Sequence, residues 1–193
     1  MLERRAAVLP VALFAILGFL APIVAHALGG ACWVYLPAHF PALLAGLSLG
    51  PLAGGLVALA TGVAELFAVD GEPGARLRIA VEILVYGLAA GAFSRPGAGW
   101  TERLVALVTA MLLGRVVHLG FASLQGMHPR ALLGPLFADA WPGIWIQIFT
   151  LPWLAYLVER WTGAAGAAPL AIPPASAETP SASRSTTDER ESG

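Results

Sequence analysis

The sequence predicts an all-α integral membrane protein with six transmembrane helices and both termini in the cytoplasm. Of its 193 residues, 58% are hydrophobic and 12% are charged, whereas soluble domains average roughly 25% charged residues. No Asp, Glu, Lys or Arg occurs between Ala6 and Ala64. A charge-free stretch of that length cannot form the water-facing surface of a soluble protein. We therefore expect it to lie in the lipid bilayer of the cell membrane.

The expected helices are apolar runs separated by Gly, Pro and charged residues. The run near the N-terminus is longer than the roughly 7 to 15 residues of a signal-peptide core, so we interpret it as a retained first span. Gly50 and Pro51 are expected to form a tight turn between the second and third helices. The six predicted helices cover residues 8–28, 39–49, 52–69, 78–93, 102–124 and 141–161.

Beyond the last predicted helix the composition changes to Ala, Pro, Ser and Thr. Such a segment buries too little apolar surface to offset the entropy of ordering it. The sequence therefore predicts a membrane domain at residues 1–162 and a disordered cytoplasmic tail at residues 163–193.

The arginines indicate the orientation, because cytoplasmic loops are enriched in Lys and Arg. Six spans place both termini on one side, and a cytoplasmic location for them puts the larger group of arginines inside. We interpret Arg76 and Arg78 either as part of a solvated turn with Asp70 and Glu72 or as contacts for an anionic substrate. The inner group is Arg4, Arg5, Arg95, Arg103 and Arg160, and the outer group is Arg76, Arg78 and Arg130.

The stretch of residues 36–55 is free of charge yet broken by Pro and Gly, and it carries His39 between Pro37 and Pro41. Irregular, polar backbone at membrane depth is tolerated only where it is buried in protein or lines a cavity. This pattern indicates a small-molecule site. The alternative is that the His39 ring only caps the start of a helix.

Away from their ends, the predicted helices contain four Asp, Glu, Arg or His residues, and each costs about 2.5 to 3.5 kcal/mol to insert at a helix centre. They are Glu65, Glu82, Arg115 and His118. Glu82 shares a helix face with Tyr86, and Arg115 shares one with His118. Two such faces turned inward would form a polar site. The alternatives are that Glu82 and Arg115 only pair with each other across two helices, and that Glu65 extends outward to the membrane surface.

Other features limit the chemistry that the chain can perform. The net charge of -1 gives no reason to expect a nucleic-acid partner, and the single cysteine, Cys32, excludes an internal disulfide. No spacing of Cys and His suggests a metal, and no catalytic or Walker motif occurs. We therefore predict no metal and no cofactor, and we expect other subunits to perform any ATP-driven work.

Four segments, in order, resemble the substrate-binding S component of energy-coupling factor (ECF) vitamin transporters, which are small six-helix membrane proteins. LPAHFPALLAGLSLGPLAGGLVALATG (residues 36–62) resembles the family's Pro-x-His-x-Pro-Val-Leu-Leu-Ala-Gly block and its following Gly-Pro. EILVYGLAAG (82–91) resembles its Glu-x-x-x-Tyr-Gly pattern, and AMLLGR (110–115) its fifth-helix Gly-Arg. PGIWIQIFTLPWLAYLVER (142–160) resembles its final Gly-x-x-x-Gln-x-x-x-x-Pro helix.

This resemblance implies a binding protein and not an enzyme. It would capture a vitamin or related micronutrient from outside and deliver it through a complex with a transmembrane T component and two ATPase subunits. Trp33 would stack on a planar ring of the ligand. The substrate-binding residues that the resemblance implies are Trp33, Tyr35, His39, Glu82, Tyr86, Arg115, His118 and Gln147.

One departure from the family concerns docking to the T component, which uses small residues spaced by four near the cytoplasmic part of the first helix. Here Ala12 and Ala15 are three apart, which leaves the docking site open. Two other functions also remain open. One is a membrane enzyme acting on a lipid or prenyl substrate, with His39, Glu82 and His118 as acid/base groups. The other is a structural membrane protein whose inner polar groups only hold helices together.

Overall fold

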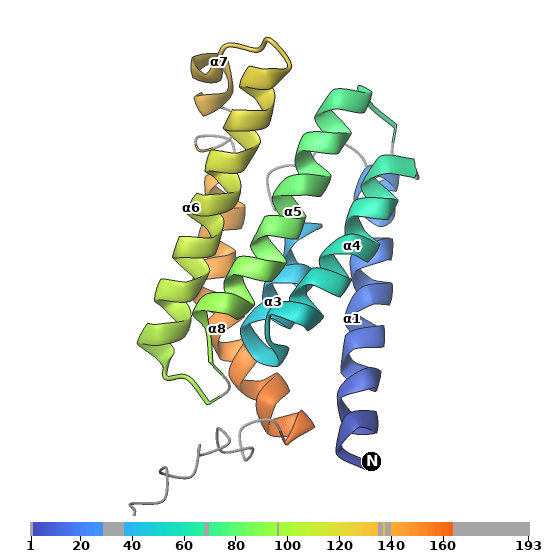
Figure 1. The fold of residues 1–193 in the computed structure, drawn as a ribbon, viewed down its shortest axis with the longest axis vertical. Coiled ribbons are helices and arrows are strands. Elements are labelled where there is room, and N and C mark those ends of the chain that lie inside the picture. Colours follow the sequence, from blue (N-terminus) through green and yellow to red (C-terminus); the bar gives the residue numbers. More distant parts are fainter. Residues whose placement is uncertain are drawn as a thin grey trace, which may run out of the picture.

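The computed structural model describes residues 2–28, 37–67, 70–95, 97–134, 137 and 140–163, and in these ranges the secondary structure is helical, without strands. The main helices run alternately in opposite directions along one long axis (Figure 1). The helices are α1 (Leu2–Ala27), α3 (His39–Leu49), α4 (Pro51–Phe67), α5 (Pro73–Phe93), α6 (Trp100–Leu124), α7 (Pro129–Leu133) and α8 (Trp141–Thr162).

Each of the six predicted segments contains a helix, but two helices begin about five or six residues earlier than predicted. α1 starts at Leu2, because the charged residues before the apolar run are compatible with a helix. α5 starts at Pro73, because the Glu72 carboxylate accepts hydrogen bonds from the backbone N–H groups of Gly74 and Ala75. The short α7 lies in a connection for which no helix was predicted.

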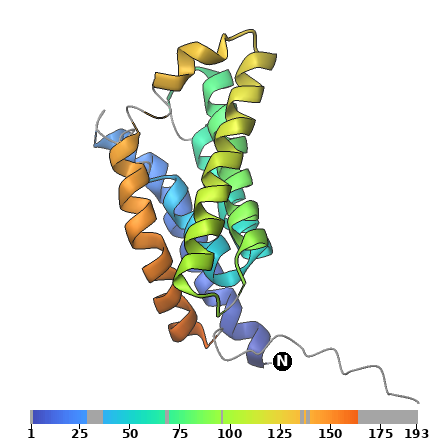
Figure 2. The ribbon, with the colours of Figure 1, turned by 90° about the vertical axis from the view of Figure 1, so that its left-hand side faces the viewer.

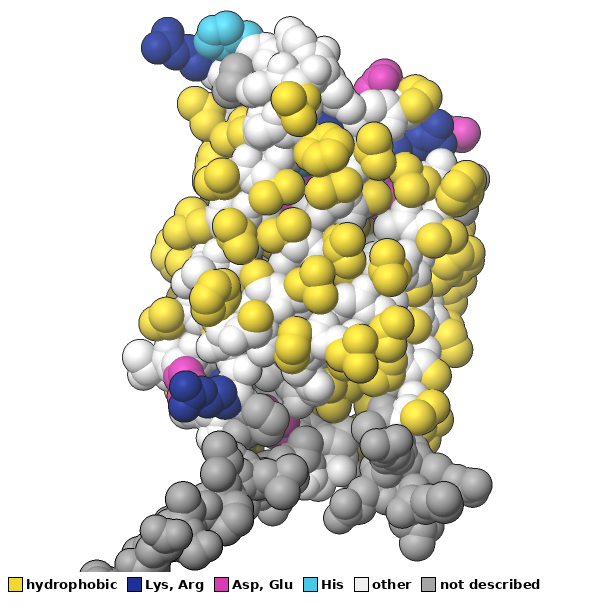
Figure 3. Space-filling model, viewed as in Figure 1, with side chains coloured by type: hydrophobic (Ala, Val, Ile, Leu, Met, Phe, Trp, Pro, Cys, Tyr) yellow, Lys and Arg dark blue, Asp and Glu magenta, His cyan; other side chains and the backbone are white. Residues whose placement is uncertain are grey.

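Among the described residues, three helices are long and apolar enough to cross a membrane: α1 from Val8, α6 and α8. α3 and α4 are apolar but shorter, with 11 and 17 residues. α5 has 21 residues, and it carries Arg76, Arg78 and Glu82. On the face shown in Figure 3, hydrophobic side chains cover the middle, and charged side chains gather toward the two ends.

The core of the bundle is built around α3. This short helix packs against α1, α4, α5 and α8, and it lies between α8 and the α5–α6 pair (Figure 2). Most of its residues are buried, including His39 and the segment from Pro41 to Ser48. A helix that is apolar on all sides is expected inside a bundle. α3 therefore serves as a central element on which the longer helices pack.

Glycines allow α3, α4 and α5 to approach one another closely. A side-chain carbon added at Gly54 of α4 would overlap the backbone of Gly87 in α5, and one added at Gly87 would overlap Gly54. Small residues at such contacts let helix backbones meet in a membrane. The predicted break is confirmed as well: α3 ends at Leu49, Gly50 has a positive φ of 92°, and α4 begins at Pro51.

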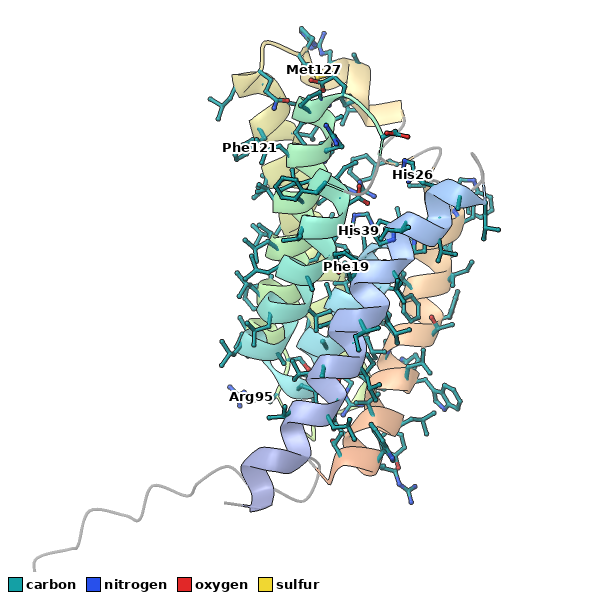
Figure 4. All side chains as sticks on the ribbon, turned by 90° about the vertical axis from the view of Figure 1, so that its right-hand side faces the viewer. Phe19, His26, His39, Arg95, Phe121 and Met127 are labelled. Carbon is teal, nitrogen blue, oxygen red and sulfur yellow. The ribbon has the colours of Figure 1, made fainter. Side chains whose placement is uncertain are left out.

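The start of α1 and the end of α8 lie at the same end of the bundle (Figure 1). Arg95 lies at this end, whereas Met127 lies at the opposite end (Figure 4). Trp33, Tyr35 and the predicted tail beyond Gly163 fall outside the described residues.

Candidate functional site

Glu82 of α5 is the centre of a buried polar cluster. Its side chain is 1% exposed. Oε1 accepts a hydrogen bond from the Tyr86 hydroxyl at 2.5 Å and lies 2.9 Å from Arg115 Nη1. Oε2 lies 2.7 Å from His118 Nδ1. The carboxylate thus binds three polar side chains in the interior of an otherwise apolar bundle.

Helical spacing explains how these side chains meet. Glu82 and Tyr86 are one turn apart on α5, while Arg115 and His118 are one turn apart on α6. The two helices pack against each other, and both faces turn toward the same place. The sequence therefore identified two polar faces, and the structure joins them through Glu82.

Gly114 provides the space for this arrangement. A side-chain carbon at Gly114 would overlap the ring of Tyr86, so the ring lies directly against the α6 backbone, next to Arg115. In the sequence, Gly114 is notable only as part of a Gly-Arg pair, and no place in the site was predicted for it. Its role depends on a contact between two helices, which no pattern within one helix reveals.

His39 adds α3 to the site. It is the first residue of α3 and is 6% exposed. Its ring packs edge-on against the Tyr86 ring, with ring centroids 5.1 Å apart and an angle of 63° between the planes. Figure 4 shows His39 inside the bundle, behind α1. The N-cap of α3 is Ala38, without a side-chain cap. His39 therefore packs against the cluster through Tyr86 and is not the N-cap of α3.

The cluster combines the two roles weighed for Glu82 and Arg115. They do pair across two helices, as the structural interpretation expects. However, the pair leaves part of Arg115 unused: within the described part of the chain, its buried Nη2 has no hydrogen-bond partner. Buried polar groups are usually hydrogen-bonded, so this nitrogen is an exception within these ranges.

Gln147 and Glu65, two other polar residues of the predicted helices, are also buried. Gln147 is a buried residue of α8, a helix that packs against α3 and α6, and it stays a candidate on the basis of that burial. Glu65 of α4 is 4% exposed. The alternative in which Glu65 extends outward is therefore wrong, because helix packing covers its side chain.

The structure also contains a buried ion pair that the sequence did not predict. Arg103 Nη2 of α6 lies 2.5 Å from Glu159 Oε2 of α8, and both side chains are almost fully buried. The same oxygen accepts a hydrogen bond from the backbone N–H of Gly97 at 3.1 Å. Glu159 thus ties the end of α8 to α6 and to the α5–α6 connection. The residues of this pair are far apart in sequence, so no local spacing predicts it.

The outer end carries a further polar contact that changes the interpretation of Arg78. Its Nη1 donates a hydrogen bond to Oε1 of Gln125, the residue that follows α6. Arg78 is 7% exposed. Arg78 is therefore not part of a solvated turn. Arg76 Nη1 donates to the backbone carbonyl of Leu66 at 2.9 Å. Both arginines connect helices at this end of the bundle.

No three His, Cys, Asp or Glu side chains of the described ranges come together as a possible metal site. The chain matches no known protein family, curated protein or solved structure. The cluster around Glu82 and the sequence segments that contain its residues are therefore the basis for proposing a function.

Proposed function

We propose that the protein is the substrate-binding S component of an ECF-type importer, which binds a vitamin or related micronutrient from outside. The observation that carries this proposal is the convergence of three helices on Glu82. His39, Glu82 with Tyr86, and Arg115 lie in three of the segments that resemble the family, and the fold brings all three segments to one buried place.

The number of polar groups favours a ligand site over a simple structural contact. One buried ion pair would be enough to join α5 and α6, yet the cluster adds Tyr86, His118 and His39. Ionisable residues at membrane depth are expensive and usually mark a substrate or ion pathway. Arg115 Nη2, a buried donor without an acceptor in the described ranges, would be free to bind such a ligand.

The proposal includes six transmembrane segments, with both termini in the cytoplasm of a cell-membrane protein. The end of the bundle that holds Met127 is then the outer end (Figure 4). Arg115 and His118 lie in the second half of α6, toward this end. A ligand would consequently enter from outside, and Trp33 and Tyr35 are proposed as additional contacts.

Because the sequence has no ATP-binding motif, any ATP-driven work would have to be done by partner subunits. A T component and two ATPase subunits would supply the energy for release on the cytoplasmic side. A structural membrane protein is the second candidate, because the pairing of Glu82 with Arg115 is what that function expects.

Equilibrium binding of the purified protein to a panel of vitamins tests these functions. We expect saturable binding without turnover, and a loss of affinity of about tenfold or more in Arg115→Ala and His39→Ala. Val116→Ala is the matched control, because Val116 is next to Arg115 but 65% exposed. Turnover of a ligand would indicate a membrane enzyme, and absence of any binding would indicate the structural function.

A further inference from the structure

We infer that the ligand of this site carries an anionic group, a carboxylate or a phosphate, which binds to Arg115. The inference rests on the proposed function and specifies the class of substrate. Its basis is which polar groups of the cluster already have hydrogen-bond partners and which do not.

Glu82 has little capacity left for a ligand. A carboxylate has about four acceptor positions, and here the Tyr86 hydroxyl, Arg115 Nη1 and His118 Nδ1 occupy three of them. The side chain is also 1% exposed. A cationic ligand that displaced Arg115 from Glu82 would leave a buried guanidinium without its partner, which is strongly unfavourable.

The charge of the cluster points the same way. Arg115 balances the charge of Glu82, so the two sum to zero. His118 donates through Nδ1 to the carboxylate and adds a positive charge whenever its second nitrogen is protonated. The three side chains therefore have a net charge of zero or above. An amine or a thiazolium group would find no unbalanced negative charge among them.

Arg115 supplies the complementary donor. Its Nη2 is buried and lacks an acceptor within the part of the chain that the structure describes. A guanidinium forms strong, charge-assisted hydrogen bonds with carboxylate and phosphate oxygens. An anionic oxygen at this position would satisfy the donor, and the His39 and Tyr86 rings pack against each other in the same cluster.

The test compares ligands that differ only in the anionic group. The pairs are nicotinate with nicotinamide, pantothenate with panthenol, biotin with biotinamide, and pyridoxal phosphate with pyridoxal; thiamine is the cationic probe. Dissociation constants are measured for the purified full chain in detergent. We expect the anionic member of at least one pair to bind about ten- to hundredfold more tightly than its neutral partner, as for one charge-assisted contact. The pair that responds separates a carboxylate from a phosphate.

Variants assign the preference to Arg115. Arg115→Gln should reduce the ratio between the anionic and neutral partners to about one. Arg115→Lys should keep part of the ratio, because it retains the charge but loses the planar fork. Glu82→Gln should alter affinity yet keep the preference, since it removes no donor of Arg115. Gel filtration identifies variants that fail to fold. If the Arg115 variants fail to fold, the ratio of the dissociation constants for the neutral and anionic partners, measured on the wild-type protein, tests the inference.

The outcomes separate this inference from the proposed function. If a neutral member or thiamine binds as tightly as or more tightly than every anionic member, the anionic class is wrong while a vitamin-binding function stands. The same conclusion follows if folded Arg115→Gln keeps the full preference. If no compound in the panel binds, the proposed function itself fails.

Discussion

At the scale of single residues, Glu82 shows how a carboxylate is accommodated inside an apolar bundle. Isolated buried charges are very unfavourable, and they are retained when paired and hydrogen-bonded. Glu82 has a cation, a phenol and an imidazole within hydrogen-bonding distance. Its neighbours come from two helices, so the same contacts that satisfy the charge also fix how α5 and α6 pack.

Gly114 is the residue on which the position of Tyr86 depends. Gly114→Ala would push the Tyr86 ring away from α6, and we expect a loss of about 1 to 3 kcal/mol in the free energy of unfolding from overpacking. Ligand binding should weaken as well, because the Tyr86 hydroxyl moves relative to Glu82. Unfolding in detergent and the dissociation constant of a bound vitamin measure the two effects.

Gly120→Ala on the same helix is the matched control. Nothing lies within 4 Å of a side-chain carbon at Gly120, so this change should be neutral or stabilise the helix by about 0.5 to 1 kcal/mol. Equal effects of the two substitutions would contradict the role assigned to Gly114.

At the scale of elements, the start of α5 depends on Glu72. Hydrogen bonds from the backbone N–H groups of Gly74 and Ala75 hold the pKa of the exposed Glu72 carboxyl below its usual value of 4.5, and the charges of Arg78 and Arg76 add to this effect. A lowered pKa in the folded state means that the ionised carboxylate stabilises the fold. This contribution is complete above pH 4.5 and is lost as the pH falls through the lowered pKa.

Glu72→Ala tests this cap. We expect the variant to melt at a lower temperature than the wild-type protein at pH 7, and the difference to shrink as the pH falls below 4.5. Thermal melts in detergent across this pH range provide the measurement. Asp70→Ala, at an exposed position before the cap, should change the melting temperature little. A difference for Glu72→Ala that is constant with pH would show that the carboxylate charge is unimportant.

The ion pair between Arg103 and Glu159 fixes the other end of the bundle. Glu159→Ala would leave the buried Arg103 without its carboxylate, and such a change typically costs about 3 to 5 kcal/mol. Glu102→Ala removes an exposed acid from the neighbouring position, so it should cost about 0.5 kcal/mol or less. Free energies of unfolding in detergent compare the two. Similar losses for both variants would mean that the buried pair contributes little to stability.

Local patterns in the sequence predicted the position of every main helix and the break at Gly50 and Pro51. They also placed Glu82 with Tyr86, and Arg115 with His118, on shared faces. Two features that these patterns did not predict depend on contacts between helices. They are the close packing of Tyr86 against Gly114 and the ion pair of Arg103 with Glu159. The fourth helix was predicted to start at residue 78, whereas the cap at Glu72 starts α5 at Pro73.

At the scale of the whole molecule, burial changes the argument for orientation. Arg103 and Arg78 were counted as loop charges on opposite sides, and both are buried among helices. Removing one from each side leaves Arg4, Arg5, Arg95 and Arg160 against Arg76 and Arg130. Arginines are still more numerous at the end that holds the start of α1 and the end of α8. This excess continues to support the proposed cytoplasmic location of the chain termini.

Cysteine labelling tests this orientation. In a Cys32→Ala background, Arg130→Cys should react with a membrane-impermeant maleimide on intact cells, because Arg130 is exposed in α7 at the proposed outer end. Arg95→Cys, exposed at the opposite end, should react only after permeabilisation. The reverse pattern would place the termini outside. Labelling of both positions in intact cells would contradict a transmembrane bundle in this arrangement.

The central claim is that the buried cluster around Glu82 is a ligand site, and an experimental structure with a bound vitamin tests it most directly. The protein would be prepared with the compound from the panel that binds most tightly. We expect ligand density within hydrogen-bonding distance of Arg115 and in contact with His39 or Tyr86. Density for the ligand elsewhere in the bundle, with the contacts of Glu82, Arg115 and His118 unchanged, would contradict the claim.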